Sequence, residues 1–301
     1  MKRSFQYTSA LILCAIVGIS MWSYKSTEIH SQEERIAQGQ KIYPVPIPTD
    51  LTFAGESVPL NKFEIKERLD RELLVNTYWQ SNTLLILKRT KKVFKVIEPI
   101  LAKNGIPDDF KYLAVIESGL LNVTSSKGAK GIWQFMESSG RSYGLQIDRG
   151  IDERYNLEKS TQAACVYLNE AYGKFGTWTL AAASYNRGMS GIRRDLTKQH
   201  VEDYFDLHLN TETSRYVMRL LALKSIIENP SSYGFILSDK DYYAHIPTQS
   251  IEVDSTIVNI SDYAQKLNTN YHVIKSLNPW IRNNELRVTN KTYTIKAPLN
   301  K

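Results

Sequence analysis

The sequence predicts a mainly α-helical protein, in which an all-α domain is followed by a small α+β domain with the order βααβ. Between residues 63 and 230, apolar residues recur at helical spacing and no segment alternates as a strand does. After about residue 236 the pattern changes to two short strand-like segments with two short helices between them. The 301 residues, 42% hydrophobic and 23% charged, suffice for one medium domain and one small domain.

Residues 1–24 have the features of an export signal or an N-terminal anchor. Two basic residues precede an apolar run at 11–22, which is shorter than the ~20 apolar residues of a membrane span. Ser20 is small enough for cleavage after it, so we expect an exported protein in the periplasm or cell envelope. An uncleaved membrane anchor stays open as an alternative, and so does a lipoprotein attached at Cys14.

Residues 25–60 are first polar and then rich in proline, as in YPVPIPTDLTFAGESVPL. This composition is typical of an extended linker. We therefore place the all-α domain at residues 61–235 and the C-terminal domain at residues 240–301.

The first helices of the all-α domain are expected in 63–79, 81–105 and 106–120. Pro99 should kink or restart the second helix, and Gly105 should end it.

Three more helices are expected in 156–176, 177–188 and 212–230. The first carries Cys165 in a buried stretch, and the second is rich in alanine and should pack closely against a neighbour. The third ends at the Asn229-Pro230 pair. In the C-terminal domain, QSIEVD and KTYTIKAP are expected as strands, and ISDYAQKLN and NYHVIKSLNPW as helices.

The net charge of +7 favours an acidic partner. The densest basic run, KRTKK at 88–92, suits a solvated helix face better than a nucleic-acid patch, so we expect no nucleic-acid partner. Two cysteines and five scattered histidines show no metal-ligand spacing. We expect no disulfide framework, no metal and no cofactor.

Glu117 lies near the end of the third helix, in the largely apolar stretch KYLAVIESGL. It follows Ala114 by three residues and Phe110 by seven, so it continues a core-facing stripe. A carboxylate there loses hydration, which raises its pKa and keeps a proton available for general acid catalysis near neutral pH. The alternative is a structural glutamate paired with a buried lysine or arginine.

The segment SSKGAKGIWQFM, at 125–136, offers groups that suit a sugar. Its glycines let backbone approach a ligand closely. Trp133 and Phe135 offer ring faces, and Gln134 offers an amide donor and acceptor. The alternative is a tight turn into a core helix.

Two later segments add polar groups. AAASYNRG places Tyr185 and Asn186 after a helix of small residues. ETSRYV places Tyr216 one turn into the last long helix, where its hydroxyl could hydrogen-bond a buried carboxylate. Taken alone, either tyrosine is more often a core residue.

In this order, ES, GAKGIWQFM, AAASYNRG and ETSRYV resemble the motifs of the soluble-lytic-transglycosylase (goose-lysozyme-like) family, in its membrane-bound D-type branch. The motifs span about residues 95–230. The resemblance implies a lysozyme-like α domain that cleaves the MurNAc–GlcNAc β-1,4 bond of peptidoglycan. The products would carry 1,6-anhydroMurNAc ends, which makes the expected enzyme a carbon-oxygen lyase.

By the same resemblance, Glu117 matches the catalytic acid and base, and Tyr216 matches the tyrosine that supports it. Other positions are expected to contribute to the substrate cleft: Ser118, Ser125, Gln134, Phe135, Met136, Tyr185 and Asn186. Glu117 would protonate the glycosidic oxygen and then take a proton from the C6 hydroxyl of MurNAc, whose acetamido group stabilises the cationic centre. Two residues depart from the family pattern: Glu137 stands where proline is common, and Arg187 where alanine is usual.

Residues 240–301 resemble a LysM module, which binds GlcNAc-containing glycans. The usual GDTL is replaced by STIVNIS, so the module is degenerate, and a structural cap is the alternative reading. We expect removal of this module to weaken binding to sacculi and to spare most catalysis.

Two other functions stay open. A lysozyme-type muramidase would need a second carboxylate to activate water, for which Asp148, Asp152 and Glu153 are candidates. A non-catalytic peptidoglycan-binding scaffold would keep the cleft for anchoring only.

Overall fold

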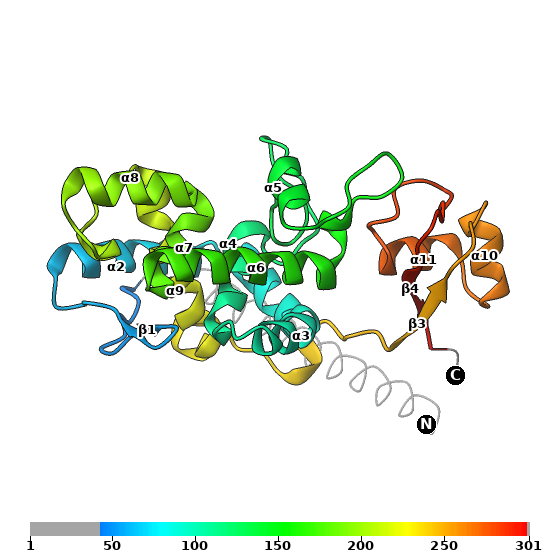
Figure 1. Cartoon of the computed structure of the whole chain (residues 1–301). Helices are drawn as coiled ribbons and strands as arrows, with labels where there is room; N and C mark the ends of the chain where they lie inside the picture. Colours follow the sequence, from blue (N-terminus) through cyan, green and yellow to red (C-terminus); the bar gives the residue numbers. More distant parts are fainter. Residues whose placement is uncertain (1–42, 300–301) are drawn as a thin grey trace, which may run out of the picture. The chain divides into compact units, whose positions relative to one another are not determined.

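The computed structural model describes residues 43–299 (Figure 1). The expected signal or anchor and Cys14 lie outside the described residues. Within them, no helix is long and apolar enough to span a membrane. Of the described residues, 45–299 belong to one compact unit.

The element order confirms the predicted class, a helical domain followed by a small domain with the order β3-α10-α11-β4. The strands and helices are β1 (Thr52–Phe53), β2 (Glu56–Ser57), α2 (Phe63–Tyr78), α3 (Gln80–Lys103), α4 (Lys111–Ser118), α5 (Glu137–Ser142), α6 (Leu157–Phe175), α7 (Trp178–Arg187), α8 (Met189–Gln199), α9 (Thr211–Glu228), β3 (Thr248–Val253), α10 (Ile260–Lys266), α11 (Tyr271–Leu277) and β4 (Tyr293–Pro298). Single 3₁₀ turns are η1 (Asp108–Phe110), η2 (Glu153–Tyr155), η3 (Tyr204–Asp206), η4 (Pro230–Tyr233) and η5 (Asp239–Asp241).

Local chemistry sets the ends of the helices. The side chain of Asn156 accepts the Lys159 N–H at the start of α6, and Asn210 accepts the Thr213 N–H at the start of α9, both at 3.0 Å. Gly176, with φ +72°, ends α6 in the left-handed conformation that glycine adopts without strain. Helix α3 runs through Pro99 without a break, where we expected a kink or a restart.

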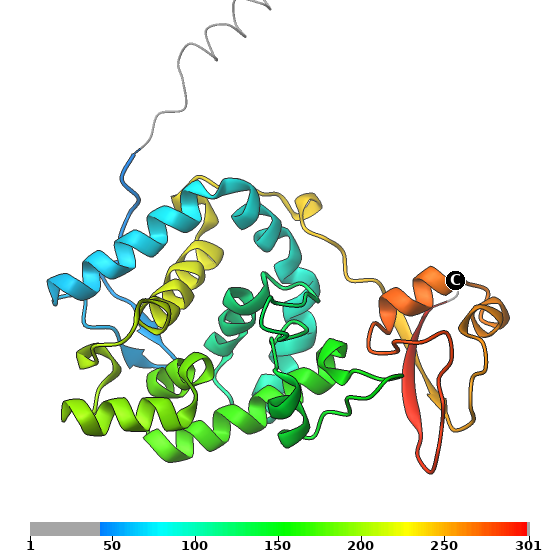
Figure 2. The same cartoon turned by 90° about the horizontal axis from the view of Figure 1, so that it is seen from above.

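The short helix α4 lies among the longer helices of the domain and packs against α3 and α9 (Figure 2). Its residues 112–115 are buried, as the apolar sequence predicts. This placement carries the last turn of α4, and with it Glu117, into the interior of the domain.

Residues 45–60 differ from the extended linker that we expected, because they pack on the helical domain. Strands β1 and β2 form a small hairpin, and the Phe53 side chain is fully buried with its ring 5.1 Å from that of Phe110. The carboxylate of Glu56 accepts the backbone N–H groups of Trp178 and Thr179, and so caps α7. A proline-rich composition cannot distinguish a free tether from a strap that follows a surface.

Helices α5 and α8 were not predicted from the sequence. Each buries one residue, Gly140 in α5 and Ile192 in α8, so neither presents an apolar stripe.

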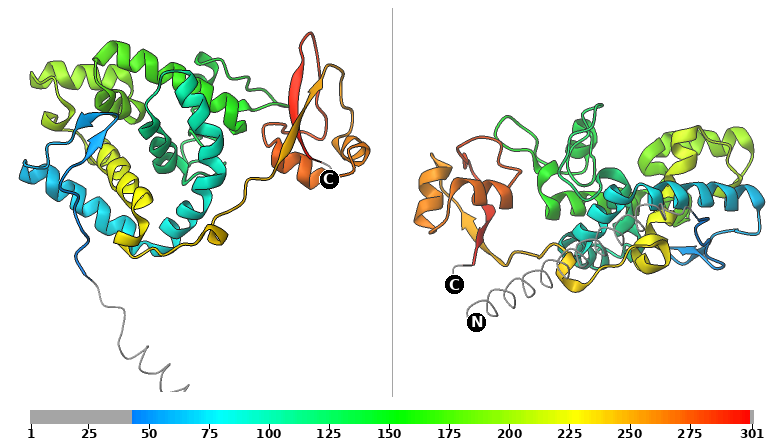
Figure 3. Two further views of the ribbon diagram at one scale, coloured as in Figure 1. Left: turned by 90° about the horizontal axis from the view of Figure 1, so that it is seen from below. Right: turned by 180° about the vertical axis from the view of Figure 1, so that it is seen from behind.

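The C-terminal domain pairs β3 and β4 as antiparallel strands and packs α10 and α11 on them. Its apolar cluster also includes Ile151 and Tyr155 from the helical domain. The backbone N–H of Asp152 donates to the Trp280 carbonyl at 2.9 Å, and that of Arg282 donates to the Gly150 carbonyl at 2.8 Å. Figure 3 shows the segment around residues 150–155, in green, beside the C-terminal domain in both views. The shared core argues against the expectation that removing residues 240–301 spares most catalysis.

We expect Lys224→Met to lower the free energy of unfolding by about 3 kcal/mol, because it strands a largely buried carboxylate. Lys224 donates to Asp109 at 2.7 Å and to the Thr52 carbonyl at 2.8 Å, and so holds the β1 segment on the domain. Lys174→Met removes a more exposed pair with Glu170 and should change the same quantity by less than about 1 kcal/mol. Urea unfolding of both variants measures the difference, and equal losses would contradict this role of Lys224.

Candidate active site

Glu117 lies in the last turn of α4, which ends at Gly119 with φ +60°. Its Oε1 accepts a hydrogen bond from the hydroxyl of Tyr216, which comes from the second turn of α9. Tyr216 is 6% exposed, whereas Glu117 keeps partial exposure to solvent. The packing of α4 on α9 thus places a carboxyl group at the boundary between the protein interior and solvent.

Burial raises the pKa of Glu117 to about 7. The Tyr216 hydrogen bond and the charge of Arg219 lower this pKa, and the charge of Glu212 raises it, but desolvation is the largest effect. Partial exposure of the Glu117 side chain is compatible with this shift, because most of the surroundings of the carboxyl group are protein atoms. Near neutral pH, Glu117 is therefore present in both protonated and ionised forms, as a group that acts in turn as acid and base requires.

Two tyrosines flank the carboxyl group. The Tyr185 hydroxyl donates to the Trp133 carbonyl at 2.8 Å, and the Tyr216 hydroxyl donates to Glu117. Burial, followed by the charge of Glu117, raises the pKa of both tyrosines well above its usual value. Both hydroxyl groups therefore stay protonated and act as donors at physiological pH.

The segment 123–136 forms the loop beside Glu117. Ser118 donates to the Ile132 carbonyl at 2.8 Å and ties the end of α4 to this loop. Inside the loop, the Ser125 hydroxyl accepts the Ala129 N–H at 3.0 Å. Ser118 and Ser125 therefore hold the loop together.

Gln134 adopts φ +50°, a left-handed conformation that is uncommon for a residue with a side chain. Its amide nitrogen donates to the Gly131 carbonyl at 2.7 Å and to the Val123 carbonyl at 3.1 Å. These bonds offset the backbone strain and leave the amide oxygen of Gln134 for a ligand. Met136, the residue after Phe135, is exposed at the end of the same loop.

Trp133 and Phe135 are core residues, which corrects the expectation that they offer ring faces to sugars. Their exposed fractions are 0% and 4%. The Trp133 indole N–H donates to Thr161 at 2.8 Å, and the Phe135 ring packs against Tyr143 and Tyr185. Alternation within so short a loop does not reveal which side chains face the interior.

Asn186 lies in the last turn of α7, and its side chain contacts the start of α9. Its carbonyl oxygen accepts the Thr213 hydroxyl at 2.9 Å, and its amide nitrogen donates to Glu212 at 3.2 Å. Arg187, the departure from the family pattern beside it, pairs with Asp195 on α8 at 3.0 Å. The other departure, Glu137, forms an ion pair with Arg141 at 3.0 Å within α5.

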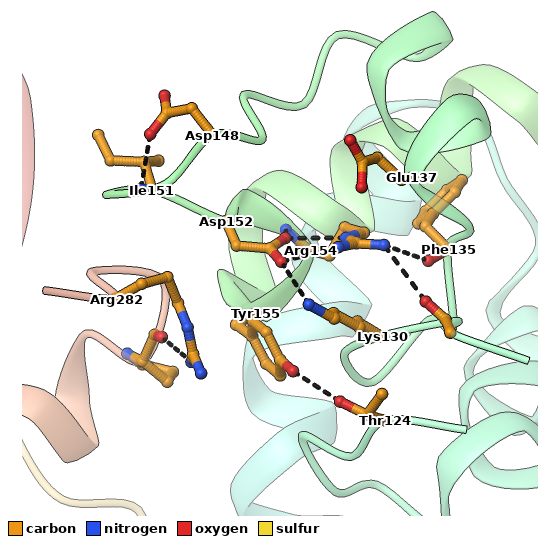
Figure 4. Close-up of polar contacts among 12 residues, drawn as sticks. Thr124, Lys130, Phe135, Glu137, Asp148, Ile151, Asp152, Arg154, Tyr155 and Arg282 are labelled. Atoms are coloured by element: carbon orange, nitrogen blue, oxygen red, sulfur yellow. Dashed lines mark hydrogen bonds and ion pairs between the residues drawn. The ribbon is translucent and has the colours of Figure 1, made fainter. Parts of the chain in front are cut away.

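A buried ion pair contacts the loop at residues 123–136 and supports its backbone (Figure 4). Arg154 donates to both carboxylate oxygens of Asp152 at 2.8 Å, and its third nitrogen lies 3.4 Å from the Phe135 carbonyl. Gly131 fits against this support so closely that a Cβ on it would lie 1.9 Å from the Arg154 carbonyl oxygen. We call residues 148–155 the brace segment.

The brace segment contains the three carboxylates that we considered as the second catalytic group of a hydrolase. Each of them already has hydrogen-bond or ion-pair partners. Asp148 accepts the backbone N–H groups of Gly150 and Ile151, and Glu153 pairs with Lys159 at 2.5 Å. Burial alone would raise the pKa of Asp152, but the hydrogen bonds and charge of Arg154 hold that pKa below its usual range. These partners argue against a role for any of the three in activating water.

Two residues near Glu117 were missed by sequence reasoning. Glu212 and Arg219 both lie on α9 and both change the pKa of Glu117. Arg219 also lies 3.6 Å from the buried carboxylate of Glu72. Their spacing from Tyr216, four residues before and three after, is the helical signal that would have placed them on the same face.

No cluster of potential metal ligands occurs among residues 43–299. Cys165 is buried in α6, as predicted, and burial raises the pKa of its thiol to about 12.

Comparison with known proteins yields two family matches. Residues 95–207 match the family described as Transglycosylase SLT domain. Residues 249–301 match the family described as Soluble lytic transglycosylase C-terminal LysM-like domain. The chain therefore contains both of the domains that its motifs predicted.

Two curated relatives are both named membrane-bound lytic murein transglycosylase D, from Escherichia coli strain K12 and from E. coli O6:H1 strain CFT073. Each is 27% identical over 252 residues, which cover 81% of this chain and 54% of the relative. The chain thus spans about half the length of the curated relatives it matches.

We expect Gly131→Ala to lower the free energy of unfolding by about 3 kcal/mol or more, because its Cβ would overlap the Arg154 carbonyl. Gly128→Ala is the matched control, since Gly128 has a similar φ of +86° but no atom within 4 Å of the position that a Cβ would take. It should lose about 1–2 kcal/mol from backbone strain alone. Thermal unfolding compares them, and equal losses would exclude close packing of the loop on the brace segment.

The raised pKa of Glu117 predicts a pH-dependent stability. In the unfolded chain Glu117 ionises near its ordinary pKa of 4.5, whereas in the folded protein it ionises near 7. Burial of Glu117 therefore does not lower the free energy of unfolding below pH 4.5. The loss of free energy of unfolding then grows to at most about 3 kcal/mol as the pH rises to 7. Glu117→Gln removes the titration, so the stability of the variant relative to the parent should increase over this pH range. A constant difference between the two proteins would contradict the raised pKa.

Proposed function

We propose, from the transglycosylase SLT domain at residues 95–207 and the geometry of Glu117, that this chain is a peptidoglycan lytic transglycosylase. It would cleave the MurNAc–GlcNAc β-1,4 bond and form 1,6-anhydroMurNAc ends. The observation that carries the proposal is a single carboxyl group, with a pKa raised to about 7, that accepts a hydrogen bond from Tyr216.

In the first step, protonated Glu117 donates to the glycosidic oxygen as the bond to the anomeric carbon breaks. The Tyr216 hydroxyl occupies Oε1, which leaves Oε2 to carry the proton that is transferred. The same hydrogen bond stabilises the carboxylate that remains after transfer. The acetamido oxygen of MurNAc stabilises the positive charge that develops on the sugar.

In the second step, the Glu117 carboxylate takes the proton of the C6 hydroxyl, and that oxygen bonds to the anomeric carbon. The proton that Glu117 gave to the leaving sugar is thereby replaced, and no water is consumed. The attack is intramolecular, so the protein has only to hold the sugar in the reactive orientation. The Gln134 amide oxygen and the exposed Met136 are the groups of the loop left to contact it.

A muramidase is the second candidate, and one residue favours it. Glu212 is 68% exposed and close enough to influence the pKa of Glu117, so it is the carboxylate best placed to activate a water molecule. Its hydrogen bond to Asn186 and its distance of 4.0 Å from Lys127 instead suit a residue of the cleft rim. We therefore give Glu212 no catalytic role.

The C-terminal domain matches a LysM-like family, which supports binding to the glycan. We further propose that the protein acts in the cell envelope, on the side of the membrane where peptidoglycan lies. The names of both relatives include the word membrane-bound, and membrane attachment of this chain through its N-terminus is part of the proposal.

We expect Glu117→Gln to abolish cleavage of sacculi and to retain glycan binding, because the amide keeps the shape but cannot exchange a proton. Glu212→Gln, a matched change in the same cleft, should retain activity within about threefold, since it removes one exposed charge that solvent screens. Mass spectrometry of the digested material should find 1,6-anhydro ends and no new reducing ends. Loss of activity in Glu212→Gln together with reducing ends would identify the muramidase instead.

A further inference from the structure

A cavity of about 620 Å³ lies outside the candidate active site, where α3, the start of α6 and residues 243–250 meet the C-terminal domain. Its volume is within the range of about 300–1,000 Å³ that is usual for small-ligand sites. No residue that we assigned to catalysis or to the substrate cleft lines it.

The wall of the cavity carries more positive than negative charge. Its fixed cations are Arg89, Lys92, Lys159 and Lys296, and its one carboxylate is that of Glu158. Lys296 pairs with Glu158, and Lys159 pairs with Glu153. No carboxylate among the described residues pairs with Arg89 or Lys92, so these two cations stay uncompensated. The cavity therefore has a positive potential that would attract an anion.

The pKa of His245, which lies in the wall of the cavity, is affected by the same positive charges. Burial, and then the charges of Lys95, Lys296 and Lys92, lower the pKa of His245, so the ring is neutral near pH 7. Lys92 and Lys95 of α3 therefore both act on His245 through their charges.

The basic side chains of the run KRTKK in α3 lie in two different environments. Lys88 and Lys91 lie over the rings of Tyr243 and Tyr242, in the segment that connects the two domains. Arg89 and Lys92 line the cavity instead. The run is therefore not the uniform solvated face that we expected.

Other parts of the wall are apolar and aromatic. Trp280 lines the cavity and stacks on Tyr293 with ring centroids 5.6 Å apart. Leu120 and Ile132 line it as well, and both are buried. A ligand that fits this wall combines carboxylates with short aliphatic segments, as a small acidic peptide does.

We propose that this cavity binds the acidic peptide stem of peptidoglycan while the glycan is held elsewhere on the protein. The choice of this peptide rests on the proposed function, since the stem is the carboxylate-bearing part of that substrate. Lys92 and Arg89 would contact its carboxylates, and Trp280 would cover its aliphatic part. A stem bound there lies against Leu120 and Ile132, close in sequence to Glu117 and Gln134.

The test uses the full chain with Glu117→Gln, so that nothing is cleaved, and measures binding of the free stem tetrapeptide by calorimetry. Adding Lys92→Glu should weaken binding about tenfold, because a charge-assisted contact becomes a repulsion. Lys103→Glu is the matched control, since it makes the same charge change on the same helix away from the cavity. The affinity of Lys103→Glu for the tetrapeptide should stay within about twofold of that of the parent protein. A tetrapeptide with amidated carboxylates should bind as weakly as the acidic peptide binds to Lys92→Glu.

A second arm compares intact sacculi with glycan strands from which an amidase has removed the stems. Lys92→Glu should reduce binding of intact sacculi and leave binding of the stripped strands unchanged. The site is overturned if the free tetrapeptide does not bind, if both charge variants bind it equally, or if the amidated peptide binds as well as the acidic one. An effect of Lys92→Glu on free peptide but not on sacculi would assign the site to released peptides and overturn the proposed stem. None of these readouts depends on cleavage, so a failure of the proposed transglycosylase activity would be seen separately.

Discussion

The candidate site depends on one hydrogen bond, from Tyr216 on α9 to Glu117 on α4, made where α4 ends inside the domain. Moving the carboxyl group into solvent would return its pKa toward the ordinary value. Burying it fully would make it inaccessible to a sugar. The packing of the short α4 on α9 sets the intermediate depth, which explains why so apolar a helix carries an acid in its last turn.

The brace segment contacts two parts of the protein on its opposite sides: the loop at residues 123–136 and the C-terminal domain. On one side Arg154 and Tyr155 contact the loop, with the Tyr155 hydroxyl 2.8 Å from Thr124. On the other, Ile151 belongs to the core of the C-terminal domain, and Arg282 lies over the Tyr155 ring at 4.4 Å. The C-terminal domain is therefore linked to the loop beside Glu117 through the brace segment, whatever its affinity for glycan (Figure 4).

The sequence predicted what depends on periodicity and local chemistry, and failed where tertiary contacts decide. Helical spacing predicted that Glu117 faces inward, and the motif order placed Tyr216 beside it. Nothing local distinguishes Phe135, which is buried, from Met136, which is exposed, because a loop with three residues in the left-handed conformation has no fixed period. The packing of Phe53 on Phe110 and the backbone hydrogen bond from Asp152 to Trp280 could not be predicted, since they depend on residues more than 20 positions away or on a second domain.

The source of the Glu117 pKa limits which chemistry the site supports. A pair of close carboxylates would raise that pKa by mutual repulsion and would leave one of them ionised to activate water. Here desolvation is the largest cause, and the nearest acidic contributor, Glu212, is well exposed, so solvent screens its charge. An acid whose proton is retained by burial keeps its strength when the neighbouring carboxylate changes. Such a site can serve as acid and base in succession with one residue, provided that the substrate supplies its own nucleophile, and this is the condition that an intramolecular C6 hydroxyl fulfils.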